Sequence, residues 1–270
     1  MSNAIVTLLS DFGSADVYVG TMKGIMLQIN PALTLVDLTH RIPAQNIQVA
    51  AFQLQNAIPY FPHGTVHLVV VDPGVGSQRR AIALKTQRAY FVGPDNGVFS
   101  SLLNPPDSNA VSSDRGTQAV VLDNPTYWST PTPSLTFHGR DIFAPVAAHL
   151  ASGVSFADLG TEVDLEDLTH LPRPQAQTLS NGFLGEIQAI DGFGNAITNI
   201  PGTWVEGRAW IAIVGNWYFP GQSTYSCVAK GEKLGLVGSH GWLELAFNGG
   251  SAQQNLGLAV GNDVQVTWQN

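Results

Sequence analysis

The chain is poor in cysteine and in charged residues. Cys227 is the single cysteine among 270 residues, so an intrachain disulfide is impossible and a reducing compartment fits. Charged residues make up 12% of the chain, and 20 acidic residues against 12 lysines and arginines give a net charge of -8. Without basic clusters, the sequence argues against a nucleic-acid-binding or membrane-surface protein.

Long apolar runs and leader-like segments are missing as well. No stretch approaches the ~18–20 apolar residues that a membrane-spanning helix needs. The segment from Met1 to Asp11 has no basic start and only a short apolar run, which argues against a signal peptide. We therefore expect a cytoplasmic protein, and its apolar content of 44% is ample for a sizeable core.

Several familiar functional motifs do not occur. The sequence contains no Walker-type loop, no glycine fingerprint for dinucleotides after the first strand, and no Gly-x-Ser-x-Gly elbow. Its seven histidines form no recognised ligand motif, and Gly64 argues against one helical face for His63 and His67. We expect no metal ion.

Short apolar runs alternate with helical patterns in the first half of the chain. Strands are expected at 4–9, 33–38 and 68–71, and helices at 17–29 and 45–57. This rhythm predicts an α/β domain with a mostly parallel, helix-covered sheet. The remaining expectations for this half are paired strands at 81–84 and 89–92, a turn at 93–97, surface loops at 104–114 and 123–133, and a helix that begins near 142.

The prolines of residues 171–175 coincide with a change of pattern, which is typical of a domain boundary. We expect an α/β domain at 1–171, a linker at 172–180 and an all-β, barrel-like domain at 181–270. No convincing helix follows the boundary. The expected strands there are 184–190, 196–200, 209–214, 233–237, 242–247 and 264–268.

Acidic residues stand where two expected strands end. Asp72 follows the run 68–71 and precedes Pro73-Gly74, and Asp11 follows the first strand. Ligands of open α/β sheets bind beyond the carboxyl ends of strands, so both acids are candidate site residues. Alternatively, Asp72 only caps its turn.

His138 lies just before a predicted helix that Asp141 would cap or enter in its first turn. A structural role is the ordinary interpretation of such a lone histidine.

Two glycine-rich segments of the second half carry polar and aromatic groups. Asp191, Phe193 and Asn195 lie within five residues, where the ring could stack on a purine and the polar groups could bind its edges. The same dipeptides also suit a tight hairpin. The segment 238–241, followed by Glu244, carries the same ambiguity.

Six motifs in one order carry a family resemblance. They are Ser10–Gly13, Asp37–His40, Val71–Gly76 with Arg79, Gly93–Gly97, Phe137–Asp141 and Phe193–Asn195. Together they resemble the S-adenosylmethionine (SAM) hydroxide adenosyltransferases, or SAM hydrolases, which are relatives of the bacterial fluorinase and chlorinase. The resemblance implies an N-terminal α/β domain and a C-terminal β-barrel. It also implies a homotrimer that binds its ligand between the N-terminal domain of one subunit and the C-terminal domain of the next.

The reaction implied by the resemblance is attack of water or hydroxide on ribose C5′ of SAM, which gives adenosine and methionine. SAM is the substrate, so no cofactor is expected. Asp72, Arg79 and His138 match the water-handling residues of the family, and Asp11 matches the acid that binds the ribose hydroxyls. The other implied substrate contacts are Phe12, Phe137, Gly139, Asp191, Phe193, Asn195, Ser239, Glu244, Phe247 and Asn248.

Two alternatives are a SAM-dependent halogenase and a non-catalytic SAM- or adenosine-binding module. The halogenases line their halide site with hydroxyl and small groups, whereas this chain offers Asp72 and His138 there, and a carboxylate repels halide. The fluorinating relatives also carry Ser-Arg at the methionine end, where this chain has Ser239-His240.

Overall fold

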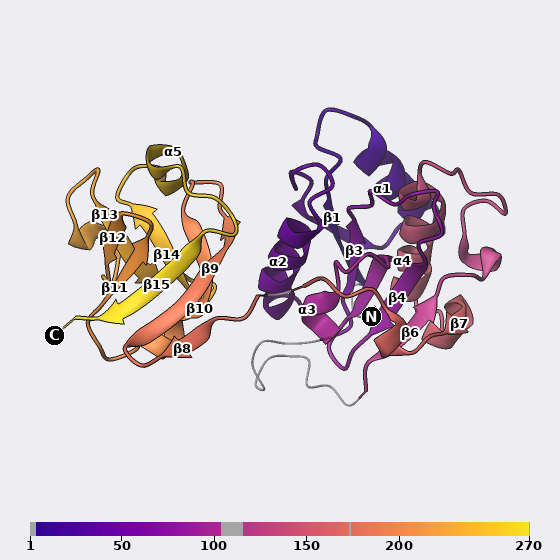
Figure 1. Cartoon of the computed structure of the whole chain (residues 1–270). Coiled ribbons are helices and arrows are strands. Elements are labelled where there is room, and N and C mark those ends of the chain that lie inside the picture. Colours follow the sequence, from indigo (N-terminus) through magenta and orange to yellow (C-terminus); the bar gives the residue numbers. More distant parts are fainter. Residues whose placement is uncertain (1–3, 104–115, 173, 270) are drawn as a thin grey trace. The chain divides into compact units, whose positions relative to one another are not determined.

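The computed structural model describes residues 4–103, 116–172 and 174–269. The chain forms two compact units, Met1–Leu171 and Pro172–Asn270 (Figure 1). The loop expected at 104–114 lies outside the described residues, as does Arg173 of the expected linker. Among the helices that the structure describes, none is long and apolar enough to cross a membrane.

The first unit is built on a mixed seven-stranded sheet in the order β2-β1-β3-β5-β4-β6-β7. The pairs β1–β2, β1–β3 and β3–β5 are parallel, whereas β4–β5, β4–β6 and β6–β7 are antiparallel. The expectation of a mostly parallel sheet is therefore only partly right. The strands are β1 (Ile5–Ser10), β2 (Thr34–Thr39), β3 (Val66–Val70), β4 (Ala81–Lys85), β5 (Tyr90–Pro94), β6 (Gln118–Val121) and β7 (Thr161–Glu162).

The short connection between β4 and β5 explains why these two strands are antiparallel. Thr86 and Ala89 close this connection, with the Thr86 amide donating to the Ala89 carbonyl at 3.0 Å. A parallel pair needs a crossover of a dozen or more residues, so four residues can only make a hairpin. The sequence pattern did predict these two strands as a pair, but it missed β6 and β7.

Helices cover both faces of this sheet (Figure 1), with α1 (Tyr18–Ile29) and α4 (Ala144–Ala151) on one face and α2 (Ile47–Ala57) and α3 (Ser100–Leu103) on the other. The helix α1 buries Met22 and Met26, four residues apart and therefore on one side of the helix. The Asn46 side chain caps α2 by accepting from the Val49 amide at 2.9 Å. Short 3₁₀ helices are η1 (Ile58–Tyr60), η2 (Pro125–Tyr127), η4 (Phe156–Leu159) and η5 (Leu165–Asp167), and η3 (Gly139–Phe143) is a π-helix.

The second unit is the expected all-β barrel-like domain, and all its strand pairs inside the barrel are antiparallel. Its order is β12-β11-β15-β9-β10-β14-β13, and β8 pairs with β9. A bridge between Gly221 and Gly235 draws the two ends of this order together. The strands are β8 (Gln177–Leu179), β9 (Gly182–Ile190), β10 (Ala196–Pro201), β11 (Trp210–Val214), β12 (Trp217–Pro220), β13 (Lys233–Val237), β14 (Trp242–Phe247) and β15 (Asp263–Trp268).

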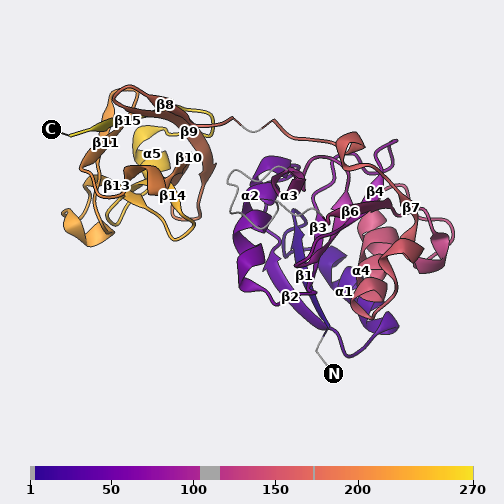
Figure 2. The same ribbon diagram turned by 90° about the horizontal axis from the view of Figure 1, so that it is seen from below.

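The expectation of no helix beyond the boundary is wrong. Ser251 caps α5 (Ala252–Leu256) by accepting from the Gln254 amide at 3.1 Å, and Ala252 is buried in the barrel core. Figure 2 shows α5 across one end of the ring of strands. The strands β8 and β12 were also missed, and the 3₁₀ helices here are η6 (Gly202–Val205) and η7 (Tyr225–Cys227).

Trp210 is buried in the core of this barrel. A Cβ atom at Gly221 would lie 2.5 Å from the indole, and one at Gly235 would lie 2.7 Å from it. The absence of side chains at these two positions therefore lets the ring occupy the interior beside the Gly221–Gly235 bridge.

Candidate functional site

Two acids follow neighbouring parallel strands of the first unit. Ser10 of β1 pairs with Val70 of β3, so Asp11 and Asp72 both come directly beyond the carboxyl ends of these strands. This is the edge at which open α/β sheets bind ligands. The placement that the sequence predicted for the two acids is the placement found.

Asp72 forms a two-pronged ion pair with Arg79. The Nε atom of Arg79 donates to Oδ1 at 2.8 Å, and its Nη2 atom donates to Oδ2. The side chains are only 6% and 9% exposed, so the pair is shielded from water. A guanidinium fork on a carboxylate fixes both groups in orientation as well as in charge.

The Arg79 guanidinium also reaches His138, since its Nη2 atom lies 2.9 Å from Nδ1 of the imidazole. Arginine can only donate, so Nδ1 accepts and the neutral ring carries its proton on Nε2. Burial and the Arg79 charge hold the pKa of His138 below its usual range, although the Asp72 and Asp141 charges oppose this. His138 is therefore a neutral imidazole that presents an N–H group at Nε2.

The loop between Asp72 and Arg79 folds back on itself. The Ser77 amide and hydroxyl both donate to the Gly74 carbonyl, at 3.1 and 2.7 Å. Gly76 has a φ of +76°, and a Cβ atom there would collide with the Leu135 carbonyl oxygen. These contacts return Arg79 to Asp72 and seat the loop against the segment that leads to His138.

His138 directly precedes the π-helix η3, which continues into α4. π-helical turns are rare in proteins as a whole, but those that occur are often found at functional sites. The Arg79 guanidinium lies 5.1 Å above the ring of Phe143, at the end of this turn. Gly139 is packed tightly, because a Cβ atom there would lie 3.0 Å from Met22 Sδ and 3.2 Å from the Phe137 ring.

An aromatic cluster lies beside this group. Phe12 and Phe137 meet edge to face with ring centroids 5.8 Å apart, and Tyr18 packs against both at 5.4 and 5.2 Å. The family resemblance implies the two phenylalanines as substrate contacts, and the sequence did not point to Tyr18 beside them. Asp11 Oδ2 accepts from the Gln45 amide at 2.8 Å, which ties the β1 end to the residues before α2.

The Asp37–His40 motif supports the end of β1. Ser10 Oγ lies 2.8 Å from His40 Nδ1, and His40 Nε2 lies 3.0 Å from Asp37 Oδ1. Although these are the residue types of a nucleophilic triad, Ser10 is completely buried and cannot meet a substrate. The chain of contacts therefore positions the loop after β1.

The second unit brings several predicted residues into one hydrogen-bonded cluster. Asp191 Oδ1 accepts from the amides of Phe193 and Asn195, at 2.9 and 2.8 Å, and Oδ2 accepts from Asn195 Nδ2 at 3.0 Å. These contacts form the hairpin turn between β9 and β10. Phe193 is 82% exposed, so its ring is free to stack on another group.

Tyr225 connects this turn to Glu244, and the sequence did not point to it. Its hydroxyl donates to Glu244 Oε1 at 2.5 Å and lies 3.5 Å from Asn195 Nδ2. Burial and the Glu244 and Asp191 carboxylates raise the pKa of Tyr225, so the phenol stays neutral. His240 Nε2 lies 3.2 Å from Glu244 Oε2, and the Trp242 amide donates to its Nδ1.

The remaining predicted residues have other surroundings. Asn248 Nδ2 donates to the Val228 carbonyl at 2.8 Å, Phe247 packs on the barrel core, and Ser239 is exposed. Nowhere in the described part of the chain do three His, Cys, Asp or Glu side chains gather as a metal site would require.

Comparisons with known proteins find relatives along nearly the whole chain. Residues 6–160 match the SAM hydroxide adenosyltransferase N-terminal domain, and residues 185–265 match the C-terminal domain of the same family. An (R)-S-adenosyl-L-methionine hydrolase of Thermus thermophilus is 41% identical, with 97% of this chain and 98% of the relative covered. One of Salinispora tropica is 37% identical, with 97% of each chain covered.

More distant sequences and solved structures complete the comparison. A fluorinase of an Actinoplanes species is 26% identical over 98% of both chains. The crystal structure of an uncharacterized conserved protein from Thermotoga maritima superposes with a TM-score of 0.88 at 34% identity, and covers 97% of this chain and 99% of its own. The chain belongs to the SAM hydroxide adenosyltransferase family.

Proposed function

We propose that this protein hydrolyses S-adenosyl-L-methionine to adenosine and L-methionine by attack of water or hydroxide on ribose C5′. The observation that carries the proposal is the convergence of Asp72, Arg79 and His138 beyond the end of β3. The substrate comes from the names of the most similar hydrolases, which also favour the (R) epimer of the sulfonium.

Hydrolysis at ribose C5′ depends mainly on a correctly positioned water molecule. A sulfonium is already a good leaving group, so no strong acid is needed at sulfur. Holding water in line with the C5′–S bond can offset ~7–11 kcal/mol of the barrier. As the water oxygen bonds to C5′, the electron pair of the C5′–S bond leaves with sulfur as the thioether of methionine.

The hydrogen bonds among the three residues divide their tasks. His138 offers a donor at Nε2, because its Nδ1 atom accepts from Arg79. Each carboxylate oxygen of Asp72 keeps a lone pair beyond the one that Arg79 uses. Accordingly, His138 orients the water and Asp72 receives its proton, a task typically worth ~10²–10⁴-fold in rate.

The substrate contacts remain proposals from the family resemblance. Asp11 would bind the ribose hydroxyls, with Phe12, Phe137 and Gly139 beside the adenosine. The second unit would supply contacts to the adenine and the methionine end. These are Asp191, Phe193, Asn195, Ser239, Glu244, Phe247 and Asn248. We further propose a homotrimer that acts in the cytoplasm without a cofactor; light scattering of the trimer should give three times the 28.8 kDa chain mass.

The test is incubation of the purified protein with each SAM epimer, with and without chloride or fluoride, and identification of the nucleoside by chromatography and mass. Adenosine without halide is expected. Asp72→Asn should lower kcat by about 10²-fold or more. Asp123→Asn is the matched control, because the Asp123 carboxylate bonds only Thr161 at the β6–β7 edge, at 2.9 and 2.7 Å, among the contacts described.

A halide-dependent 5′-halogenated nucleoside would contradict hydrolysis, as would SAM binding without turnover on prolonged incubation. Wild-type turnover by Asp72→Asn would leave the activity standing and disprove the assigned proton acceptor.

A further inference from the structure

We infer that Asp141 is a positioning residue that holds His138 against Arg79 through the segment before it. The kinetic part of this inference rests on the proposed function, whereas its geometry does not. Asp141 follows His138 by three residues, and its side chain is only 3% exposed. A buried carboxylate this close to the reacting group requires several donors.

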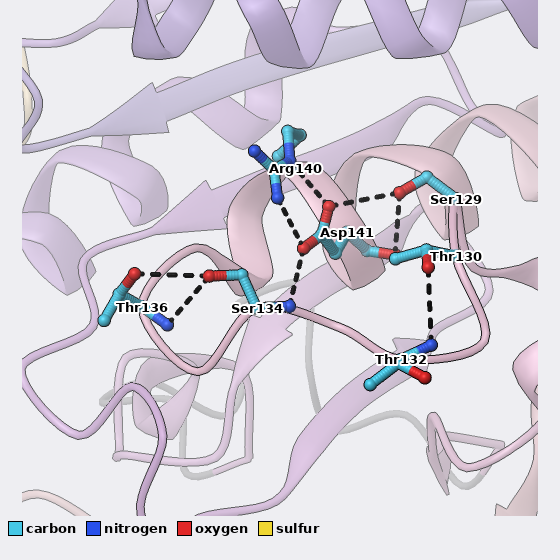
Figure 3. Close-up of polar contacts among 7 residues, drawn as sticks. All are labelled: Ser129, Thr130, Thr132, Ser134, Thr136, Arg140 and Asp141. Atoms are coloured by element: carbon cyan, nitrogen blue, oxygen red, sulfur yellow. Dashed lines mark hydrogen bonds and ion pairs between the residues drawn. The ribbon is translucent and has the colours of Figure 1, made fainter.

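The donors of Asp141 come from three places (Figure 3). Arg140 donates to both oxygens, from Nε at 2.6 Å and from Nη2 at 2.8 Å. The Ser134 amide donates to Oδ2 at 2.8 Å, and the Ser129 hydroxyl donates to Oδ1 at 3.2 Å. Burial alone would raise the pKa of Asp141, but these bonds and the Arg140 charge hold it below its usual range. The carboxylate is therefore ionised, and each of its oxygens accepts two hydrogen bonds.

These bonds fasten residues 129–137, which we call the strap. The Ser129 amide also donates to the Asp141 carbonyl at 3.0 Å. Asp141 therefore binds the beginning of the strap through two hydrogen bonds from Ser129 and its middle through one from Ser134. Within the strap, Ser134 Oγ accepts from the Thr136 amide at 3.3 Å (Figure 3). The strap runs from there to Phe137 and His138 without an intervening helix or strand.

The strap touches both halves of the water-handling group. Its Leu135 carbonyl packs against Gly76, in the loop that joins Asp72 to Arg79. At its end, the Phe137 carbonyl accepts from the amides of Arg140 and Asp141, both at 3.2 Å. Since Asp141 fixes the strap, it fixes where the His138 imidazole stands relative to the Arg79 Nη2 atom, 2.9 Å away.

Asparagine at this position would break the arrangement without changing the size of the side chain. Its amide keeps one acceptor oxygen, and its NH₂ group would face donors from Arg140, Ser134 or Ser129. The strap would lose a tie, and His138 would move relative to Arg79. A displacement of about 1 Å near the reacting atoms can cost about 10²-fold in rate.

A purely stabilising role is separated from positioning by a double-mutant cycle. We would measure kcat and KM for the wild type, Asp141→Asn, His138→Ala and the double variant, at a temperature where circular dichroism shows all four folded. We expect Asp141→Asn to lower kcat at least about tenfold with KM within about threefold. In the His138→Ala background it should lower kcat less than about twofold.

Equal losses of kcat in both backgrounds would overturn the inference, as would wild-type kcat in Asp141→Asn. If Asp141→Asn does not fold, Ser129→Ala removes one donor and should lower kcat about threefold in the wild-type background alone. Equal effects of Ser129→Ala in both backgrounds, or none in either, would overturn it too.

A second readout needs no substrate. Nitrogen NMR of ¹⁵N-histidine-labelled protein, with His138→Ala to assign the resonance, should show the Nε2–H form of His138 in the wild type. Asp141→Asn should give a mixture of tautomers, and an unchanged Nε2–H signature would overturn the inference. If the tautomer shifts while the wild type releases no adenosine, the proposed function fails and the positioning role stands.

Discussion

Nη2 of Arg79 lies 2.9 Å from Nδ1 of His138, and the same nitrogen donates to the carboxylate of Asp72. One guanidinium nitrogen thereby joins an acid on the β3 loop to an imidazole 59 residues beyond the arginine. Because arginine offers no acceptor, this contact leaves His138 with its proton on Nε2. In the proposed mechanism, His138 then donates a hydrogen bond to the water and does not act as a base.

Substitutions of His138 distinguish these two roles. His138→Ala should lower kcat by about 10²-fold, because the water loses a partner. His138→Gln restores an N–H near the place of Nε2 and should turn over at least about tenfold faster than His138→Ala. Steady-state kinetics with SAM measures both. Equal impairment of the two variants would instead favour a base.

The pH dependence of kcat follows from the lowered pKa of His138. The neutral form accepts from Arg79, whereas the protonated form cannot accept and is repelled. The folded protein therefore keeps its active form as the pH falls through ~6.5, the ordinary value for histidine, and loses it only below. We expect a flat kcat from about pH 8 to about pH 6.5, with an acid-side loss that His138→Gln removes. A midpoint at or above ~6.5 would contradict this expectation.

Tyr225→Phe tests the cluster in the second unit. The substitution removes the hydroxyl that donates to Glu244 at 2.5 Å, and Glu244 is buried. Leaving a buried acceptor with one donor fewer should cost about 1–3 kcal/mol of unfolding free energy. If Glu244 contacts the substrate as proposed, KM should rise with little change in kcat. Tyr218→Phe, at an exposed position of β12, is the control for both measurements.

His67 makes folding stability depend on pH. It is 1% exposed, lies 2.7 Å from Thr7 Oγ1 and stacks on Phe91. Burial, with a smaller effect of Arg88, lowers its pKa to about 4. The unfolded chain binds a proton below ~6.5 and the folded chain does not, so stability falls as the pH drops from ~6.5 towards about 4, by up to ~3 kcal/mol.

Urea unfolding across that pH window measures the effect. His67→Gln should flatten the dependence, while His63→Gln, at an exposed position, should leave it unchanged. An equally steep loss of stability in His67→Gln would assign the dependence to other groups.

Local sequence signals predicted the parts of the site that lie at strand ends. Asp72 and Asp11 were recognisable because an apolar run stops before each of them. His138 became a candidate only through the family resemblance, because the helical pattern after it is equally typical of a structural histidine. Tyr225 and Glu244 are 19 residues apart, and only the tertiary fold brings them together. A local sequence pattern cannot predict a contact between residues so far apart in the chain.

The errors in the fold have similar causes. The strands β6, β7, β8 and β12 have two to four residues each, which is too short for a clear alternation of polar and apolar side chains. The mixed sheet includes one tight turn after β4, which makes β4 and β5 antiparallel, and two further antiparallel pairs formed by β6, which is too short to be recognised from the sequence. The helix α5 has five residues, fewer than a periodic pattern needs to be visible.

The Trp210 indole is buried in the core of the second unit. It occupies the space that side chains at Gly221 and Gly235 would otherwise fill. Because side chains fill this core, a nucleoside that contacts the second unit, as proposed, would have to meet its surface turns, such as Asp191–Asn195. We therefore expect substitutions in such turns to change substrate preference, and substitutions of Trp210, Gly221 or Gly235 to act on the fold of this unit.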